Sequence, residues 1–320
     1  MNPTVSIVLC TYNGAKYLRA QLDSLLRQSY PVHEIIVQDD YSTDETWEIL
    51  EEYQSQNSIF KLYRNEEEHG VNGNFLSAMA RTTGDYIAIC DQDDVWENDK
   101  IALQMDAIGD KMMCSGLSRS FSSDGSFAHF DDRVHNTSIF RMLFLCLPGH
   151  TLLFRRSLLA ELPPLSHPVY RITMYDAVLC IIASAYDSLV FTPFVLVNFR
   201  RHTAATTYKD YRRSLPSWRN GLHELLWGIR HYREARSVAV PIYRGKLALL
   251  EYINAETADF IEAKKMMRRE VSDTPLDFVR LQILLVRHSR QLFQTEGGGI
   301  VKKLRAFLYP VMQLYMYRQS

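Results

Sequence analysis

The sequence predicts an α/β fold: a mostly parallel sheet flanked by helices, followed by a helical extension at the C-terminal end. Over the first hundred residues, short apolar runs alternate with amphipathic segments. The apolar runs are nearly continuous, which is typical of strands covered on both faces. From about residue 208 onward no strand pattern is found. At 320 residues and 47% hydrophobic content, the chain can build one large core or two modest ones.

The first half reads as strand followed by helix, three times over, and then a fourth strand. The first helix follows Asn13 and Gly14 and carries leucines at helical spacing. Ser42 and Glu45 form a capping-box pattern ahead of the second helix, and Gly84 closes the third. The expected strands are residues 5–10, 33–38, 59–65 and 85–90.

After Asn98 the pattern loosens. We expect a helix near 100–108, a strand around 112–118, a polar loop over 122–133 and a helix over 173–186. A turn at Pro148 and Gly149 precedes a further strand, and 188–202 reads as two short strands broken at Pro193. These elements predict a first domain over 1–207, divided at 105/106, and a second over 208–320.

Charge and cysteine content narrow the classes of protein. Residues 1–207 carry 16 Lys/Arg and 26 Asp/Glu, a net of -10, whereas 208–320 carry 20 and 11, a net of +9. The five cysteines show no metal-binding spacing. No apolar run is long enough to span a bilayer and no leader pattern is present. We therefore expect a cytoplasmic protein whose two parts do different work.

Polar residues gather where the first, second and fourth strands end. They are Thr11, Tyr12 and Asn13, then Asp39 and Asp40, then Asp91, Asp93 and Asp94. Ligands of parallel sheets bind at this edge. Closely packed carboxylates repel one another unless a cation offsets them, and Mg²⁺ and Mn²⁺ bind through carboxylates and substrate phosphates. A metal that bridges to a phosphorylated ligand is one interpretation, and a solvated acidic turn is the other.

Together, "VSIVLCTYNG", "DDYSTD" and "CDQDDVW" resemble the family 2 glycosyltransferases, which have the GT-A fold, a Rossmann-like sheet. The resemblance covers residues 4–105 closely and continues loosely to 203. It implies that 1–105 bind a nucleotide sugar and 106–207 face the acceptor. The form of the carboxylate motif and of the "FRRH" segment is most similar to the rhamnosyltransferase-like branch, which implies dTDP-rhamnose, with UDP-hexoses also open.

The resemblance implies roles for single residues. The nucleotide would contact the residues Thr11, Tyr12, Asn13, Asp40, Asn74, Asp91 and Gln92. Asp40 would accept a hydrogen bond from the base, and Asn74 is explained equally well as a helix N-cap. Asp93 would bind the Mn²⁺ or Mg²⁺ ion, with Asp91 reaching the ribose or a metal-bound water.

On the acceptor side, Asp94 and Trp96 would face the acceptor, although Trp96 also fits a core position. His150 would touch the donor sugar or the acceptor, or pack within its loop. His202 would contact the metal or the diphosphate. Asp176, at the start of the helix over 173–186, is the implied general base; a plain helix N-terminal carboxylate is the alternative.

These roles imply an inverting transfer of sugar to a saccharide or lipid-linked acceptor in bacterial cell-surface polysaccharide synthesis. The basic extension suits peripheral contact with the inner face of the plasma membrane, or packing against the first domain or a second copy in a homodimer. We expect no nucleic-acid partner, because no recognisable binding module is present. The competing functions are a metal-dependent nucleotidyltransferase, for which a glycine-rich basic loop is missing, and an inactive carbohydrate-binding scaffold.

Overall fold

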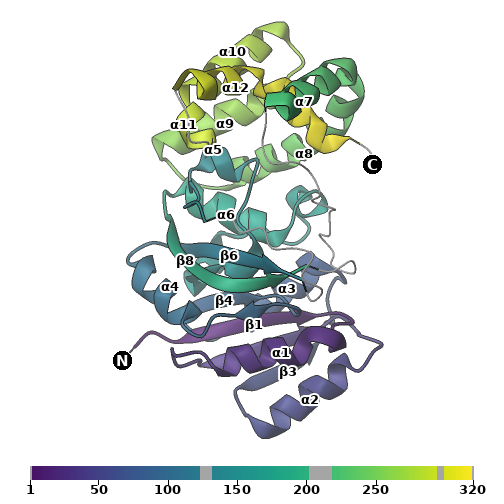
Figure 1. Ribbon diagram of the computed structural model, residues 1–320, viewed down its shortest axis with the longest axis vertical. Coiled ribbons are helices and arrows are strands. Elements are labelled where there is room, and N and C mark those ends of the chain that lie inside the picture. Colours follow the sequence, from purple (N-terminus) through teal and green to yellow (C-terminus); the bar gives the residue numbers. More distant parts are fainter. Residues whose placement is uncertain (1, 123–131, 202–217, 294–298, 319–320) are drawn as a thin grey trace.

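The computed structural model describes residues 2–122, 132–201, 218–293 and 299–318. Its centre is an eight-stranded sheet with the order β3-β2-β1-β4-β7-β6-β8-β5 (Figure 1). The parallel half consists of β1 (Val5–Thr11), β2 (Glu34–Asp39), β3 (Phe60–Arg64) and β4 (Tyr86–Cys90). The mostly parallel sheet and its first four strands are thus confirmed.

Helices α1 (Ala15–Leu26), α2 (Thr46–Gln56) and α3 (Val71–Ala80) join these strands. Alternate residues of β1 belong to different core clusters: Ile7 packs in the cluster that contains Leu22 of α1, and Val8 in the one that contains Phe75 of α3. Period-two alternation therefore buries both faces of the strand. The capping box is wrong, because the N-cap residue Glu45 makes no side-chain cap of α2 and the Ser42 hydroxyl donates to Asp39 instead.

The mixed half of the sheet contains β5 (Val95–Trp96), β6 (Met113–Phe121), β7 (Leu153–Arg155) and β8 (Leu189–Arg200). Strand β7 runs antiparallel to both β4 and β6. The two strands expected around Pro193 are one strand: the pairing passes from Gly116–Thr192 to Leu117–Val195, so Pro193 lies in a bulge. A proline usually interrupts a strand, which is why a break was predicted. A bulge tolerates the missing N–H of proline, so the strand continues past Pro193.

Short helical segments complete this part of the chain. They are α4 (Lys100–Ile108), α5 (Ile139–Met142), α6 (Tyr175–Ala185) and the 3-10 turns η1 (Gly149–Thr151), η2 (Arg156–Glu161) and η3 (Pro168–Arg171). Most of the expected loop at 122–133 lies outside the described residues. The turn at Pro148 and Gly149 places η1 in contact with β4, and Ile89 N of β4 donates to the carbonyl of Leu152, the residue after η1.

The extension is helical wherever it is described, as predicted. It comprises α7 (Trp218–Arg230), α8 (Tyr232–Tyr252), α9 (Ala258–Glu270), α10 (Pro275–Arg287), α11 (Ser289–Leu292), α12 (Gly299–Met312) and η4 (Gln313–Tyr317). One apolar cluster runs from Val178 of α6 to Tyr243 and Leu284 in this region. The extension packs on the sheet domain chiefly through α5 and η3, at the far end from β3 (Figure 1). Among the described helices, none combines the length and apolar character of a membrane span.

Candidate functional site

The loops after β1, β2 and β4 meet because parallel pairing sets Thr11 beside Asp39 and Leu9 beside Cys90. The Thr11 hydroxyl donates to Asp39 Oδ1 at 2.7 Å, and Asp39 also pairs with Arg64. Both Thr11 and Asp39 are buried. These side chains therefore hold the edge of the sheet in shape and offer no free group to a ligand.

The loop after β1 is held by two amides that the sequence assigned to nucleotide binding. Gln92 accepts from Tyr12 N at 2.9 Å and donates to Tyr12 O at 3.0 Å. The Asn13 side chain accepts from Thr43 N at 2.8 Å. With its backbone fixed, Tyr12 leaves its ring 58% exposed, so the ring is the part of this loop that is open to a planar ligand.

Asp40 lies at the same edge with both oxygens hydrogen-bonded. Oδ1 accepts from Asn65 at 2.7 Å and His69 at 2.8 Å, and Oδ2 from Gly70 N at 2.8 Å. Burial raises the pKa of Asp40, but these hydrogen bonds outweigh burial and lower the pKa below its usual range. The carboxylate thus stays ionised as an acceptor. Asn65 and His69 were missed, because they belong to no motif.

An acidic cluster forms behind the end of β4. One ligand atom each from Asp91, Asp94 and His150 lies within 4.8 Å of the others. His150 Nδ1 is 3.4 Å from Asp91 Oδ2 and 3.5 Å from Asp94 Oδ2. Asp94 is 0% exposed; its Oδ1 accepts from Arg200 N at 2.9 Å, while Oδ2 has no hydrogen-bond partner among the described residues.

The charges of this cluster favour an added cation. Burial raises the pKa of Asp94, His150 opposes this rise and Asp91 and Asp93 add to it, so that the net pKa is about 7. Burial lowers the pKa of His150, but Asp94 and Asp91 outweigh it and the net shift is upward. Two carboxylates therefore share one buried imidazole, and either its proton or a metal ion offsets their charge.

Several predicted contacts differ from this arrangement. Asp94 as an acceptor contact is wrong, because its side chain is sealed beneath the strand ends. Trp96 is 2% exposed, with Lys100 Nζ 3.9 Å from its ring centroid, so the core position is the correct one. Asn74 is 4% exposed within α3 and donates to Gln38 O, so it neither caps the helix nor faces a ligand.

Three other assignments stay predictions. His150 is buried in the acidic cluster and stacks on Phe199 with ring centroids 4.9 Å apart, which leaves little of it for a sugar. Asp93 is half-buried at the same strand end but is not part of the cluster; its carbonyl accepts from Arg200 Nε at 2.9 Å. His202 lies outside the described residues.

Asp176 lies in the first turn of α6 and faces the cluster. Its carboxylate accepts from Ala177 N at 2.7 Å and from Gly149 N. Burial raises its pKa to about 6, to which nearby Asp91 contributes. The start of the helix is fixed by Tyr175, whose N–H donates to Asn72 at 2.8 Å. Asp91 is thus close enough to Asp176 to raise its pKa, and the role of Asp176 as the general base stays a prediction.

Gly149 leaves no room for a side chain beside this carboxylate. A Cβ there would lie 2.6 Å from the Tyr175 hydroxyl and 3.4 Å from Asp176 Cβ. We expect Gly149→Ala to lower the free energy of unfolding by about 1–3 kcal/mol through overpacking, and to lower kcat by displacing Asp176. Thermal melts and steady-state rates measure both effects.

The matched control is Gly299→Ala, because a Cβ at Gly299 meets nothing within 4 Å. Gly109→Ala would be a poor control because Gly109 has φ +50°.

A cavity of about 700 Å³ opens beside the start of α6. Its walls are residues 68–73, ahead of and within α3, and residues 165–166 and 170–174, ahead of α6. It includes His69, which binds Asp40, and ends one residue before Tyr175. The cavity therefore lies between His69, which contacts Asp40, and the residues that precede α6, and neither Asp40 nor Asp176 lines it.

Comparison with known proteins adds a family and a fold. Residues 6–162 match the model of "Glycosyl transferase family 2". The chain is 32% identical over 150 residues, 43% of its length, to the provisionally named teichuronic acid biosynthesis glycosyltransferase TuaG of Bacillus subtilis. It is 37% identical over 101 residues, 32% of its length, to the UDP-Glc:alpha-D-GlcNAc-diphosphoundecaprenol beta-1,3-glucosyltransferase WfaP of Escherichia coli. The matches span 59% of TuaG and 39% of WfaP.

Two solved structures share the fold over nearly the whole chain. S. aureus TarS in complex with UDP-GlcNAc has a TM-score of 0.54 at 13% identity, over 98% of this chain and 90% of that one. The mannosyltransferase PcManGT of Pyrobaculum calidifontis, in complex with GDP-Man and Mn²⁺, has a TM-score of 0.55 at 17% identity, over 99% and 85%. The similarity includes the helical extension.

Proposed function

We propose that this chain, which belongs to glycosyl transferase family 2, transfers a sugar from a nucleotide-sugar donor to a saccharide or lipid-linked acceptor in cell-surface polysaccharide synthesis. One observation carries the proposal: the exposed Tyr12 ring, the ionised Asp40, the Asp91 cluster and Asp176 meet at one edge of the sheet. Sugar transfer needs groups of these kinds at one place: a ring and a hydrogen-bond acceptor for the nucleobase, a charged cluster for the diphosphate and a carboxylate for the acceptor hydroxyl.

The Asp91, Asp94 and His150 cluster fits a divalent metal. It offers two carboxylate oxygens and one imidazole nitrogen, and the buried Asp94 Oδ2 has no hydrogen-bond partner among the described residues. The imidazole favours Mn²⁺ over Mg²⁺, which prefers an all-oxygen shell. Asp93 stays the predicted further ligand. A bound metal would neutralise the leaving diphosphate, which contributes several kcal/mol to such transfers.

We assign the remaining steps to side chains of this chain. The Tyr12 ring stacks on the base, and Asp40, held ionised, accepts from the base or its ribose. Asp176 takes the proton of the acceptor hydroxyl as that oxygen bonds to the anomeric carbon and the bond to the diphosphate breaks on the opposite face. The configuration is thereby inverted. A positioned base contributes about 10²- to 10⁴-fold to the rate.

The donor is a dTDP-rhamnose or a UDP-hexose in this proposal. WfaP is named for UDP-Glc, and the TarS structure is a complex with UDP-GlcNAc, which supports the UDP-hexose. The acceptor of WfaP, by its name, is linked to a diphosphoundecaprenol. A lipid-linked acceptor places the chain at the inner face of the plasma membrane, and we propose that residues 208–320 make the peripheral contact.

A donor panel tests the proposed function. The protein is incubated with dTDP-rhamnose, UDP-glucose and UDP-N-acetylglucosamine, with Mn²⁺ and a lipid-linked saccharide. We expect release of a nucleoside diphosphate from one donor, lost on chelation of the metal. Release of pyrophosphate from a nucleoside triphosphate would identify a nucleotidyltransferase instead. If donors bind but none turns over with any acceptor, the chain is a carbohydrate-binding scaffold.

A further inference from the structure

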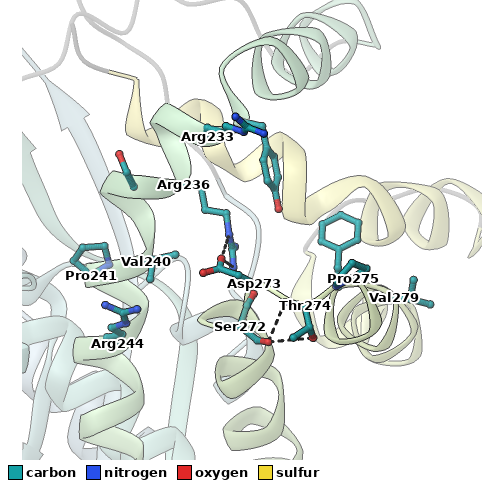
Figure 2. Close-up of a pocket in the computed structure, with 13 residues that line it drawn as sticks. Arg233, Arg236, Val240, Pro241, Arg244, Ser272, Asp273, Thr274, Pro275 and Val279 are labelled. Carbon is teal, nitrogen blue, oxygen red and sulfur yellow. Dashed lines mark hydrogen bonds and ion pairs between the residues drawn. The ribbon is translucent and has the colours of Figure 1, made fainter.

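A second cavity lies in the helical extension, away from the sheet. Its volume is about 780 Å³. Helix α8 forms one side with Arg233, Arg236 and Arg244, and the connection from α9 to α10 forms the other (Figure 2). The three arginines lie at positions i, i+3 and i+11 of α8 and therefore share one face of that helix.

Two of these arginines have no hydrogen-bond or ion-pair partner in the part of the chain that the structure describes. Arg236 is engaged: it donates to Asp273 at 3.1 Å and to Ser272 O at 2.5 Å (Figure 2). Arg233 and Arg244 are exposed and make no ion pair or hydrogen bond with any residue that the structure describes. Asp273 is the acidic side chain that lines the cavity, and Arg236 already neutralises it. The cavity therefore carries two uncompensated positive charges.

The rim of the cavity continues into an exposed apolar stripe. Val279 lines the cavity and is exposed, and Leu276 and Ile283 are exposed three residues before and four after it on α10. Helix α12 packs along α10, where Gln282 donates to Phe307 O at 3.0 Å. Its own exposed apolar side chains are Ile300, Val301, Leu304 and Phe307. Aliphatic side chains exposed in such number mark a surface that another apolar phase covers.

We propose that this cavity binds the phosphate group of an anionic membrane lipid, with the α10 stripe in contact with the acyl region. Free cations beside exposed aliphatic side chains match a headgroup followed by hydrocarbon. A soluble phosphate would use the cations but leave the stripe in water. The positive charge of the chain lies in the same part as the cavity: residues 208–320 carry a net of +9 and residues 1–207 a net of -10. The inference rests on the membrane contact proposed above and names its site.

Vesicle co-sedimentation of the full chain tests the inference. The vesicles contain phosphatidylglycerol in phosphatidylcholine, or phosphatidylcholine alone, and no donor or acceptor is present. We expect Arg233→Gln/Arg244→Gln to weaken binding to the anionic vesicles by about 30-fold, since each arginine at such a surface contributes about 1 kcal/mol. The matched control is Lys265→Gln/Arg287→Gln, which removes two charges that pair with Glu262; binding there should change less than about 3-fold.

Each other outcome overturns a stated part. If the wild-type protein does not bind anionic vesicles, both the proposed membrane contact and the proposed lipid site are wrong. Equal losses in the two double variants show that bulk charge binds the surface, and unchanged binding in the arginine variant removes the lipid from this cavity. Thermal stabilisation by inorganic phosphate alone, lost in the arginine variant, would make it a soluble-anion site. Light scattering that finds a dimer abolished by Val279→Asp would assign the stripe to a second copy.

The proposed function has its own readout. Transfer to a short water-soluble acceptor should stay within about 2-fold of wild type in the arginine variant, because the cavity lies apart from the Asp176 site. A wild-type protein that binds anionic vesicles but turns over no donor would overturn the transferase proposal and leave the lipid site standing.

Discussion

Asp176→Asn is expected to lower kcat by about 10²- to 10⁴-fold and to leave donor affinity within about 2-fold. Asparagine keeps the oxygen that accepts from Ala177 N and Gly149 N, so the first turn of α6 is preserved, but it cannot take a proton from an acceptor hydroxyl. Steady-state rates and calorimetric donor binding separate the two effects. An equal loss of donor affinity would show that Asp176 binds the nucleotide sugar and is not the base.

The pH dependence of the same carboxylate gives an independent check. Burial raises the pKa of Asp176 to about 6, above its usual value, so the basic form is present above pH 6 and is lost as the pH falls through 6. We expect kcat to fall tenfold per pH unit below that point, and the limb to vanish in Asp176→Asn. Asp187→Asn is the matched control, because Asp187 is exposed and its φ of 51° is one that asparagine tolerates.

Much of the fold was predictable because its signals are local. The strand β1 needs only an apolar run followed by a glycine, and the period of the leucines identifies α1 without tertiary information. The order of the mixed half was not predictable, since β7 contributes three residues between β4 and β6. The bulge in β8 escaped for a related reason: Pro193 breaks the local pattern, while pairing with β6 continues on both sides of it.

The site was predictable only as far as strand ends determine it. Asp40 and Asp91 follow β2 and β4, and parallel strands place their carboxyl ends together. Side-chain burial is not encoded by spacing. Asp94 and Trp96 follow the same strand end as Asp91, yet both point inward, where Asp94 fixes the end of β8 through Arg200 N.

Partners from distant loops were the hardest to predict. His150 reaches the carboxylates because it lies in η1, which contacts β4. His69 reaches Asp40 from the loop after β3. Neither position has a spacing rule that relates it to its carboxylate. An isolated histidine is usually structural, so His69 was not selected from the ten in the chain, and His150 was selected only through the resemblance, without its contact to the carboxylates.

Asp91→Asn is expected to weaken Mn²⁺ binding and to lower kcat/KM by about 10²-fold or more. Asp91 is the more exposed carboxylate of the cluster and lies 3.4 Å from His150 Nδ1, so in the proposed site its charge would face a bound ion and the leaving diphosphate. Several kcal/mol of charge neutralisation corresponds to at least that factor in rate. Mn²⁺ binding is measured by electron paramagnetic resonance in the absence of donor, and the rate by a Mn²⁺ titration.

Asp106→Asn is the control for the loss of one carboxylate, because Asp106 is exposed on α4.

Comparison of Asp93→Asn with Asp94→Asn then decides which carboxylate completes the site. If Asp94 holds the ion with Asp91, its variant loses Mn²⁺, whereas loss of the further ligand Asp93 only weakens Mn²⁺ binding. If the reverse is found, the His150–Asp94 contact is an internal ion pair, and the metal lies further out, between Asp91 and Asp93. Asp94 Oδ2 accepts no hydrogen bond from the described residues and has His150 Nδ1 at 3.5 Å. This favours the first result, because a buried carboxylate oxygen without a hydrogen-bond donor is costly unless a cation approaches it.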